Sequence, residues 1–537
     1  MHSVIFLYHH VGYLVEFVLI IINNRQIIMD KIRIREKYLT VNDIAAIARD
    51  GIVVCLTKES EERIINARKL VEEWVDEGKI IYGITTGFGA LNNVIIPRES
   101  TMRLQENIIL SHSAGVGNRL DNEIVRATMV LRINDFAMGY SGIRLETVRV
   151  LLDLLNNGIC PVVPEKGSVG ASGDLAPLAH LSQVLLGLGV AYYNGKEISG
   201  KEALEICAHQ PVKLVPPEGL ALVNGTQVMT AIAGLAVYDA LRLSKTADIA
   251  ASMSLEVLLG TNIELDPRIH EIKPHPGQIA AAKNMRRITK DSEIISSHKD
   301  CSYLQDAYTL RCSPQVHGAS KDAIKYANQV VETEMNSVTN NPLIFSESGE
   351  FLLGGNFHGQ HIALAMDFLS MAVSEHANIA ERRIERLVNP QLSGLPAFLV
   401  PDGGTNSGFM IAQYTAASLV SENKILSHPA CVDSIPTSAN KEDHVSMGTI
   451  SARKCREIVK NSEHVIAIEL LCGAQAMDLF TNLKPGAGTH AAYKVIRDAV
   501  PSLAHDRILS NDIEAVVELI KSEKILHSVE NVIGELL

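Results

Sequence analysis

The spacing of hydrophobic and polar positions along this chain of 537 residues is mostly helical. Within residues 40–78, Thr-Val-Asn-Asp precedes an Ile-Ala-Ala-Ile-Ala run, a pattern typical of a capped helix start. A second run in the same segment places four apolar side chains on one helix face: Ile64, Ile65, Leu70 and Val71. Helical spacing recurs in further segments: residues 100–156, 217–260, 318–340, 358–386 and 407–427.

Signals for β-strands are short and local, and occur mainly at residues 342–345 and 351–353. Residues 175–190 are apolar on nearly every side, which predicts a buried helix. The last fifty residues are rich in Ile, Val, Glu and Lys and predict amphipathic surface helices. Small residues recur on the apolar faces and allow close helix packing. The sequence therefore predicts a mainly α protein built around a bundle of long helices.

The first 28 residues differ from the rest of the chain. Residues 4–22 are strongly apolar, but Glu16 interrupts them and no Lys or Arg precedes them. A secretory signal needs a basic start and a small-residue cleavage site, and both are missing. A membrane helix is possible by length, yet a glutamate at its middle is costly. We therefore interpret residues 1–28 as an extension upstream of a natural start at Met29, which the intact mass of the native protein would test.

Composition narrows the class of protein. The net charge is −12 and Lys and Arg are scattered, so the sequence predicts no nucleic-acid surface. The eight cysteines form no CxxC pair, which favours reduced thiols in the cytoplasm over a disulfide framework or a zinc site. His358 and His361 form an HxxH pair without a third ligand at suitable spacing. We therefore predict neither a metal site nor a membrane association.

One segment combines glycines with small residues before an apolar, helix-like run: Gly167–Leu178, with the sequence Gly-Ser-Val-Gly-Ala-Ser-Gly-Asp-Leu-Ala-Pro-Leu. Glycines permit positive φ and very close backbone approach. In the triplet Ala171-Ser172-Gly173, such compression can bring the amide nitrogen of Gly173 onto the carbonyl carbon of Ala171. Ring closure with loss of water, including the Ser172 hydroxyl, yields 4-methylidene-imidazol-5-one, an electrophile. An ordinary Gly-Ser loop and a phosphate-binding turn remain equally compatible with this segment alone.

Further motifs follow in a fixed order along the chain: Tyr82–Gly89 (Tyr-Gly-Ile-Thr-Thr-Gly-Phe-Gly), Asn224-Gly225-Thr226, Gln305–Gln315 and Gly354–His358. Together with the Ala-Ser-Gly triplet, they resemble the family of ammonia-lyases and aminomutases that act on aromatic amino acids through a methylidene-imidazolone group. The resemblance extends from about Tyr82 to the C-terminus. It implies a long-helix fold related to fumarase and aspartase, and a homotetramer whose active sites draw on more than one subunit.

The resemblance also implies a division of the chain. We expect residues 29–230 to carry the catalytic loop and the electrophile triplet, and residues 231–537 to form the central long-helix bundle and the C-terminal helices. The two regions would make one integrated catalytic unit. No external cofactor is expected, because the electrophile forms from the chain itself.

Removal of ammonia from an amino acid requires a better leaving group and abstraction of a weakly acidic β-proton. An electrophile formed by Ala171, Ser172 and Gly173 meets the first need by covalent catalysis. Tyr82 matches the tyrosine of the family's loop and is our candidate base; its pKa must fall for it to act as a phenolate. Asn224 is the family's candidate for holding negative charge on the ring oxygen.

The resemblance assigns the remaining site residues. Tyr308 would orient the electrophile or share proton transfer. Arg311 offers a planar fork for the substrate carboxylate. Phe357 would pack on the reacting ring system, and Gln305 would support the site by hydrogen bonding.

Two positions bear on the substrate, a small amino acid. His112 lies at a predicted helix end before a glycine pair, and Glu442 lies in the Pro436–Met447 segment. A glutamate in the pocket could bond to an imidazole, whereas against a phenyl ring it would stay buried and unpaired. Both segments resemble those of family members that act on histidine, which implies elimination of ammonia from L-histidine to give trans-urocanate.

Other positions keep alternatives open. Lys441 stands where members acting on histidine commonly have Gln, and Gly359-Gln360-His361 and Lys484-Pro485-Gly486 look more like the tyrosine-acting members. The alternatives are a tyrosine 2,3-aminomutase and a tyrosine or phenylalanine ammonia-lyase with the same electrophile. A non-catalytic structural relative would need a broken triplet, and here the triplet is intact.

Overall fold

The computed structural model describes residues 19–22, 25–28, 31–87, 89–91, 93–298 and 305–537. The chain divides into two compact units. Unit 1 consists of Met1–Leu235, Val331–Ala363 and Cys431–Ile450, and unit 2 of Ala236–Val330, Leu364–Ala430 and Ser451–Leu537. Most of the extension that we placed upstream of Met29 lies outside the described residues. Its described part forms an antiparallel hairpin of strands β1 (Leu19–Ile22) and β2 (Arg25–Ile28).

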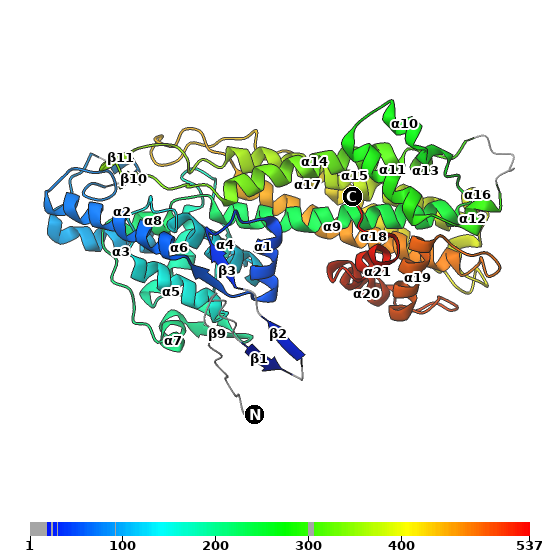
Figure 1. Cartoon of the computed structure of the whole chain (residues 1–537), viewed down its shortest axis with the longest axis horizontal. Helices are drawn as coiled ribbons and strands as arrows, with labels where there is room; N and C mark the ends of the chain where they lie inside the picture. The colour runs from blue at the N-terminus through cyan, green and yellow to red at the C-terminus, as the bar shows by residue number, and fades with distance from the viewer. Residues whose placement is uncertain (1–18, 23–24, 29–30, 88, 92, 299–304) are drawn as a thin grey trace, which may run out of the picture. The chain divides into compact units, whose positions relative to one another are not determined.

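Helix α4 (Asn122–Phe136), labelled in Figure 1, is a core helix of unit 1. Its residues from Ile124 to Phe136 are buried, apart from Arg126, and it packs against α1 and α5. The other helices that lie wholly in unit 1 are α1 (Val41–Ala45), α2 (Lys58–Asp76), α3 (Thr101–His112), α5 (Leu145–Asn156), α6 (Leu175–Gln183), α7 (Gly200–Ile206) and α8 (Glu218–Val223).

The first predicted helices are confirmed in place. Thr40 caps α1 in a capping box with Asp43, as the Thr-Val-Asn-Asp sequence predicts. The buried stripe of α2 differs from the predicted one. It consists of Ile64, Ala67, Val71 and Trp74, whereas Ile65 is 50% exposed. The prediction for Ile65 was wrong because a helix turns by about 100° per residue, which carries the neighbour of a buried position toward solvent.

Residues 175–190 do not form the single helix that their composition predicts. Helix α6 ends at Gln183 and is followed by a short 3-10 turn, η4 (Val184–Leu186). Gly187 then adopts φ +74, a left-handed conformation that commonly ends helices. Leu188 and Val190 beyond it are exposed, so the buried part of this segment ends with η4.

The strands of unit 1 form small separate sheets. The strand signals at residues 342–345 and 351–353 are confirmed as β10 (Leu343–Phe345) and β11 (Glu350–Leu352), and the structure pairs these two strands antiparallel. The remaining pairs were not predicted, since each strand is too short to show alternation. They are β3 (Ile32–Ile34) with β4 (Val54–Leu56), β5 (Val116–Arg119) with β7 (Pro164–Lys166), and β6 (Cys160–Pro161) with β8 (Val190–Tyr193) and β9 (Lys196–Ser199).

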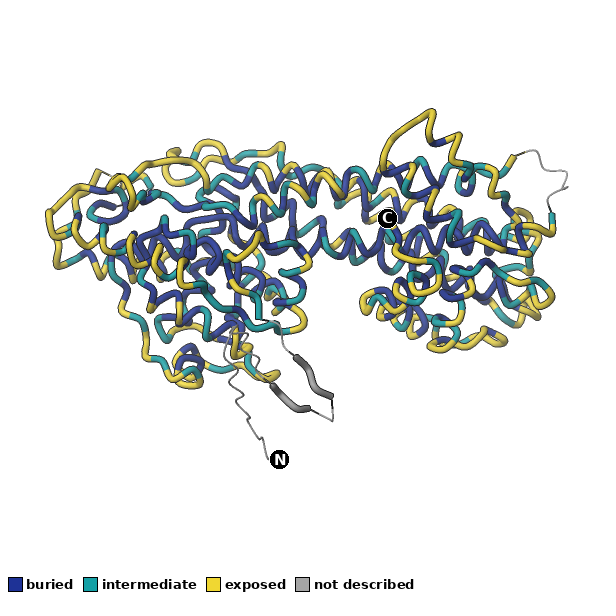
Figure 2. The backbone as a smooth tube through the Cα atoms, viewed as in Figure 1, coloured by how far each residue is buried: buried dark blue, intermediate teal, exposed yellow. Residues whose placement is uncertain are grey.

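Long helices form the core of unit 2, where they are largely buried (Figure 2). The chain passes between the units inside these helices: α9 (Gln227–Val257), α14 (Ser313–Met335), α15 (Gln360–Val388) and α18 (Gly448–Met477). The other helices of unit 2 are α10 (Pro267–Glu271), α11 (Pro276–Ile288), α12 (Glu293–Ser296), α13 (Tyr308–Arg311), α16 (Pro390–Ser393), α17 (Met410–Leu426), α19 (Ala487–Ala499), α20 (Leu509–Lys521) and α21 (Lys524–Ile533). The predictions of a mainly α fold and of C-terminal helices are confirmed.

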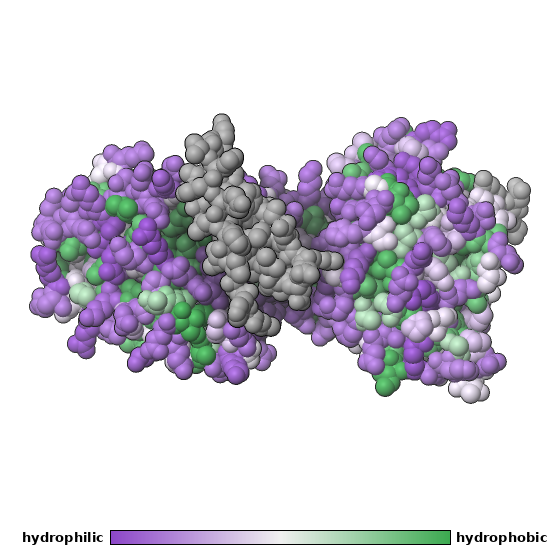
Figure 3. Space-filling model, turned by 60° about the horizontal axis from the view of Figure 1, so that its bottom comes forward, coloured by the Kyte–Doolittle hydropathy of each residue, from purple (hydrophilic) through white to green (hydrophobic). Residues whose placement is uncertain are grey.

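The face drawn in Figure 3 is largely hydrophilic where residues are described. Figure 3 shows one face, on which small groups of hydrophobic residues, in green, lie among hydrophilic residues, in purple. Exposed apolar side chains also occur at helical spacing on α15, at Leu364, Phe368 and Met371. None of the helices in the described part of the chain has the length and apolar run that a bilayer crossing requires.

A buried ion pair joins the long helices of unit 2. The guanidinium of Arg383 in α15 donates from Nη2 to Oε2 of Glu469 in α18 over 3.0 Å. Ser254 in α9 donates to the other carboxylate oxygen over 2.7 Å. Both charged side chains are fully buried, so each depends on the other for compensation.

Replacement of Arg383 by methionine should lower the free energy of unfolding by about 3–5 kcal/mol, because it leaves the Glu469 charge buried and unpaired. The double variant Arg383→Met/Glu469→Leu should recover most of that loss, since no buried charge remains. Thermal and denaturant unfolding of both variants would measure the effect. Equal stability of the single and double variants would contradict it.

Candidate active site

The loop around Ser172 lies between β7 and α6 and depends on glycine at two positions. Gly170 and Gly173 have φ values of +69 and +74. A Cβ atom on Gly173 would lie 2.0 Å from the carbonyl oxygen of Gly225, and one on Gly170 would lie 2.1 Å from Oγ of Ser446. The predicted close backbone approach is therefore confirmed.

Two distant segments brace this loop. The amide of Gly225 donates to the Ser172 carbonyl over 3.3 Å, and the amide of Asp174 donates to the Gly225 carbonyl over 2.8 Å. On the other side, the amide of Met447 donates to the carbonyl of Val169 over 2.9 Å. The triplet is thus held at both ends by backbone hydrogen bonds.

Asp174 anchors the loop to the start of α6, and sequence analysis did not include it among the site residues. Its carboxylate is fully buried and accepts from Ser168 Oγ over 2.9 Å, from the Met229 amide over 2.8 Å, and from Thr449 Oγ1. Burial raises the pKa of Asp174, while these hydrogen bonds oppose the rise. The sequence signal that could have identified Asp174 is its position, as an acid directly between the triplet and the start of a predicted helix.

Glu442 is the side chain that meets Ser172. The Ser172 hydroxyl donates to Oε1 of Glu442 over 3.0 Å, although 270 positions separate the two residues. The hydroxyl of Thr437 donates to Oε2 of Glu442 over 2.9 Å, and the backbones of Thr437 and Glu442 form an antiparallel bridge. The carboxylate therefore has a fixed orientation beside the triplet.

Tyr82 and His112 share the electrostatic surroundings of Glu442. Burial raises the pKa of Tyr82, and the charge of Glu442 raises it further, whereas a hydrogen bond from the Gly89 amide to the Tyr82 hydroxyl, 3.1 Å long, lowers it. Sequence analysis required a lowered pKa, and the surroundings within unit 1 act in the opposite direction. Phe88, in the same motif, lies outside the described residues.

His112 is the last residue of α3, as predicted for a helix end. Its Nδ1 lies 3.1 Å from the hydroxyl of Ser111. Burial lowers the pKa of His112, while a backbone hydrogen bond at Ile108 and the charge of Glu442 oppose the decrease. The imidazole is therefore neutral at and above neutral pH.

Asn224 lies at the end of α8, next to the segment that braces the triplet. Its side chain is 4% exposed, and its Oδ1 has no hydrogen-bond partner among the described residues. An amide oxygen accepts hydrogen bonds, and a ring closed from the triplet carries only acceptor atoms, so Asn224 would meet such a ring through its amide N–H. The feature that suits the ring is the glycine cradle at Gly173, where a Cβ atom would not fit.

Phe357 is half-buried in the connection between β11 and α15. The next residue, His358, stacks on the ring of His444 with centroids 5.7 Å apart, so this connection runs beside the segment that carries Glu442. No group of three or more His, Cys, Asp or Glu side chains within the described ranges is arranged to hold a metal ion.

The other predicted site residues belong to unit 2. Tyr308 and Arg311 form the short helix α13, and the guanidinium lies 4.8 Å from the centre of the Tyr308 ring. Tyr308 is 72% exposed, and Gln305 is also exposed. Nε of Arg311 is buried and lacks a hydrogen-bond partner in the described part of the chain. Unit 1 therefore gathers the triplet, Tyr82, His112, Asn224, Phe357 and Glu442, while unit 2 carries the remaining three residues.

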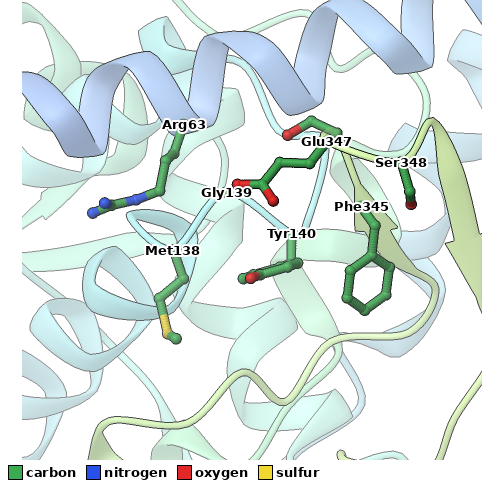
Figure 4. A pocket seen from close by; sticks show the side chains of 8 residues that line it. Arg63, Met138, Gly139, Tyr140, Phe345, Glu347 and Ser348 are labelled. Carbon is green, nitrogen blue, oxygen red and sulfur yellow. The ribbon is translucent and has the colours of Figure 1, made fainter.

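Unit 1 also contains a pocket of about 260 Å³, which Figure 4 shows with its lining residues. Arg63 of α2, Tyr140 and the β10–β11 hairpin residues Phe345 and Glu347 contribute to it. The rings of Tyr140 and Phe345 meet edge to face, 5.3 Å apart. None of the predicted site residues lines this pocket, so it is not the candidate active site.

Comparisons with known proteins place the chain in a family. The family model for aromatic amino acid lyases matches residues 39–498. A histidine ammonia-lyase of Alkaliphilus oremlandii is 54% identical over 94% of this chain and 99% of its own length. The crystal structure of histidine ammonia-lyase from Trypanosoma cruzi is 42% identical, with a TM-score of 0.87 over 94% of this chain and 96% of that one. A tyrosine aminomutase from Streptomyces globisporus is 35% identical, with a TM-score of 0.90 over 95% and 100%.

Proposed function

Because the chain belongs to the aromatic amino acid lyase family, we propose that it is a carbon–nitrogen lyase that converts L-histidine into trans-urocanate and ammonia. The observation that carries the choice of substrate is the carboxylate of Glu442, held 3.0 Å from the Ser172 hydroxyl. A carboxylate at this position suits an imidazole that can donate a hydrogen bond, whereas beside a phenyl ring it would be desolvated without a partner. The 54% identical relative is likewise a histidine ammonia-lyase.

The electrophile in this proposal is 4-methylidene-imidazol-5-one, formed from Ala171, Ser172 and Gly173 without an external cofactor. When formed, it supplies an electrophilic carbon that makes the substrate's amino group a better leaving group. The glycine cradle at Gly173 supports its formation here. The amide N–H of Asn224 would donate to the ring oxygen and hold its negative charge.

The side chains around the triplet would carry out proton abstraction and substrate binding. Tyr82 would remove the β-proton as a phenolate. Glu442 and the neutral His112 would bind the imidazole of the substrate, and Phe357 would pack against the ring system. The charge of Glu442 affects the pKa of both Tyr82 and His112, which supports placing the two side chains in one site.

The residues of unit 2 support a shared site in a homotetramer. Tyr308 is exposed, and Arg311 keeps a buried, unpartnered Nε within the described residues, which suits a guanidinium that awaits a carboxylate. We propose that Gln305, Tyr308 and Arg311 complete the site of a partner subunit. The exposed apolar positions on α15, at Leu364, Phe368 and Met371, suit burial against a second copy of the chain.

The cysteines support a cytoplasmic location. Within the described residues they are free thiols, as expected in a reducing compartment.

Turnover of L-histidine, L-tyrosine and L-phenylalanine, with identification of each product, tests the proposal. We expect trans-urocanate from histidine at a rate far above that of any product from the other two. The similarity to a tyrosine aminomutase makes β-tyrosine the product to look for in the second reaction. Robust turnover of tyrosine without formation of urocanate would overturn the proposal in favour of tyrosine 2,3-aminomutase or tyrosine ammonia-lyase activity.

Replacement of Glu442 by alanine should lower kcat/KM for histidine by about 10²- to 10³-fold, because the imidazole loses a fixed charged acceptor. Asp443→Asn is a matched control, since Asp443 is an exposed neighbouring carboxylate, and it should keep the wild-type rate. Steady-state kinetics on both variants would measure the effect. Equal losses in the two variants would contradict the role of Glu442.

A further inference from the structure

A buried ionic cluster lies directly behind the segment that braces the triplet. Arg132 of α4 is 1% exposed and Asp135, one turn further on, is 2% exposed; Nη1 of Arg132 lies 3.4 Å from Oδ2 of Asp135. Burial lowers the pKa of Arg132 to about 10, so its guanidinium is charged near neutral pH. Neither residue belongs to the proposed catalytic set, and the reaction by itself gives no reason for a buried cation at this place.

The guanidinium of Arg132 holds the backbone on both sides of the α8 terminus. It donates from Nη1 to the carbonyl of Asn224 over 2.8 Å and to Oε1 of Gln227 over 2.6 Å, and from Nη2 to the carbonyl of Ala221. Gln227 in turn donates to Asp135 over 2.9 Å. The cation therefore holds the backbone immediately before Gly225 and a side chain two residues after it.

Gly225 fills the space between this cluster and the triplet. A Cβ atom built on Gly225 would lie 2.7 Å from Nη1 of Arg132 and 2.4 Å from Oε1 of Gln227. On its other side, Gly225 forms a parallel bridge with Gly173 and exchanges backbone hydrogen bonds with Ser172 and Asp174. The position of Gly173 is thus set by Gly225, and the position of Gly225 is set by Arg132.

We propose that Arg132 is a positioning residue for formation of the electrophile: through Gly225 it holds Gly173 in the conformation in which the triplet closes on itself. This rests on the proposed function, since it presupposes that Ala171-Ser172-Gly173 cyclises. In the first step the amide nitrogen of Gly173 bonds to the carbonyl carbon of Ala171. The carbonyl oxygen leaves as water with one proton from that amide and one from the amide of Ser172. A second water is then lost, formed from the hydroxyl of Ser172 and the Cα proton of the same residue.

The physical reason is the poor reactivity of an amide nitrogen. It attacks a neighbouring carbonyl at a useful rate only when the two atoms are held close and aligned, and small misplacements cost large factors in rate. The planar guanidinium can bond to several acceptors at once. A lysine would keep the charge beside Asp135 but could not hold Asn224, Gln227 and Ala221 in the same plane.

The mass of the loop peptide in variant proteins tests this role independently of catalysis. In the wild type, the peptide that contains Ala171–Gly173 should be lighter than encoded by two waters. Arg132→Lys should fold, with the same helical content and assembly, but the fraction of lighter peptide should form roughly tenfold to a hundredfold more slowly after synthesis. Gln227→Met, which removes the amide between Arg132 and Asp135, should slow the change in the same direction.

Arg126→Lys is the matched control. Arg126 lies on the same helix and also donates to several carbonyls, at Ile47, Ala48 and Leu155, but it has no hydrogen bond to the Asn224–Gln227 segment. Its loop peptide should mature at the wild-type rate. If Arg132→Lys fails to fold, the rate at which the lighter loop peptide forms in Gln227→Met decides the test.

Each outcome separates the two proposals. An encoded-mass peptide in the wild type would overturn the proposed electrophile itself. A wild-type peptide lighter by two waters, together with wild-type rates in Arg132→Lys or, where that variant does not fold, in Gln227→Met, would overturn only the positioning role. Equal slowing in Arg126→Lys would also overturn it, because the effect would then be one of general stability.

Discussion

Replacement of Ser172 by alanine is expected to leave a folded protein whose turnover of histidine falls by a factor on the order of 10³ or more, the scale at which single catalytic groups are lost. Alanine has no hydroxyl to eliminate, so the exocyclic double bond cannot form. The structural cost is small, because the half-buried hydroxyl makes one described hydrogen bond, to Glu442, worth about 1 kcal/mol.

Steady-state kinetics, thermal unfolding and the mass of the loop peptide check this result together. Ser182→Ala is the control: Ser182 is a buried serine of α6 whose hydroxyl bonds to the Leu178 carbonyl of its own helix, and its removal should leave turnover near that of the wild type. The loop peptide of Ser172→Ala should not lose the water that carries the serine hydroxyl. Substantial turnover by Ser172→Ala would remove the electrophile from the mechanism.

Replacement of Tyr82 by phenylalanine should lower kcat by about 10²- to 10⁴-fold, the range of general-base catalysis. The pH dependence gives a second signature. Burial and the charge of Glu442 raise the pKa of Tyr82, so the phenolate is a minor form at neutral pH and its population increases as pH rises. The wild-type kcat should therefore increase with pH by up to about tenfold per unit below that pKa.

The profile is best measured on kcat, because the substrate's own amino group titrates in the alkaline range and affects kcat/KM. The pKa of His112 is lowered, so this residue does not titrate above neutral pH and does not contribute to the alkaline rise. In Tyr82→Phe the rise should disappear. Tyr140→Phe, in the separate pocket of unit 1, should keep it. An unchanged profile in Tyr82→Phe would exclude the phenol as the base.

The local pattern of the sequence was sufficient for much of the fold. Helices α1 and α2, the end of α3 at His112 and the strands β10 and β11 depend on periodicity and capping, which act between near neighbours. The requirement for glycine at Gly173 could also be predicted, because positive φ and close approach are properties of the residue itself. The family resemblance then supplied the roles of the site residues, which remain proposals.

The tertiary structure decided what no local pattern encodes. The contact of Ser172 with Glu442 and the support of Gly225 by Arg132 join segments far apart in sequence, and apolar periodicity carries no information on such pairs. The direction of a pKa shift depends on burial, which only the folded structure shows. Burial raises the pKa of Tyr82, although the role assigned to this residue required a lowered pKa. The sequence by itself determined the helical fold class, many of the helices and the position of the triplet. Which charged groups lie beside the triplet was decided only by the packing of distant segments, because such contacts form only when both segments are folded.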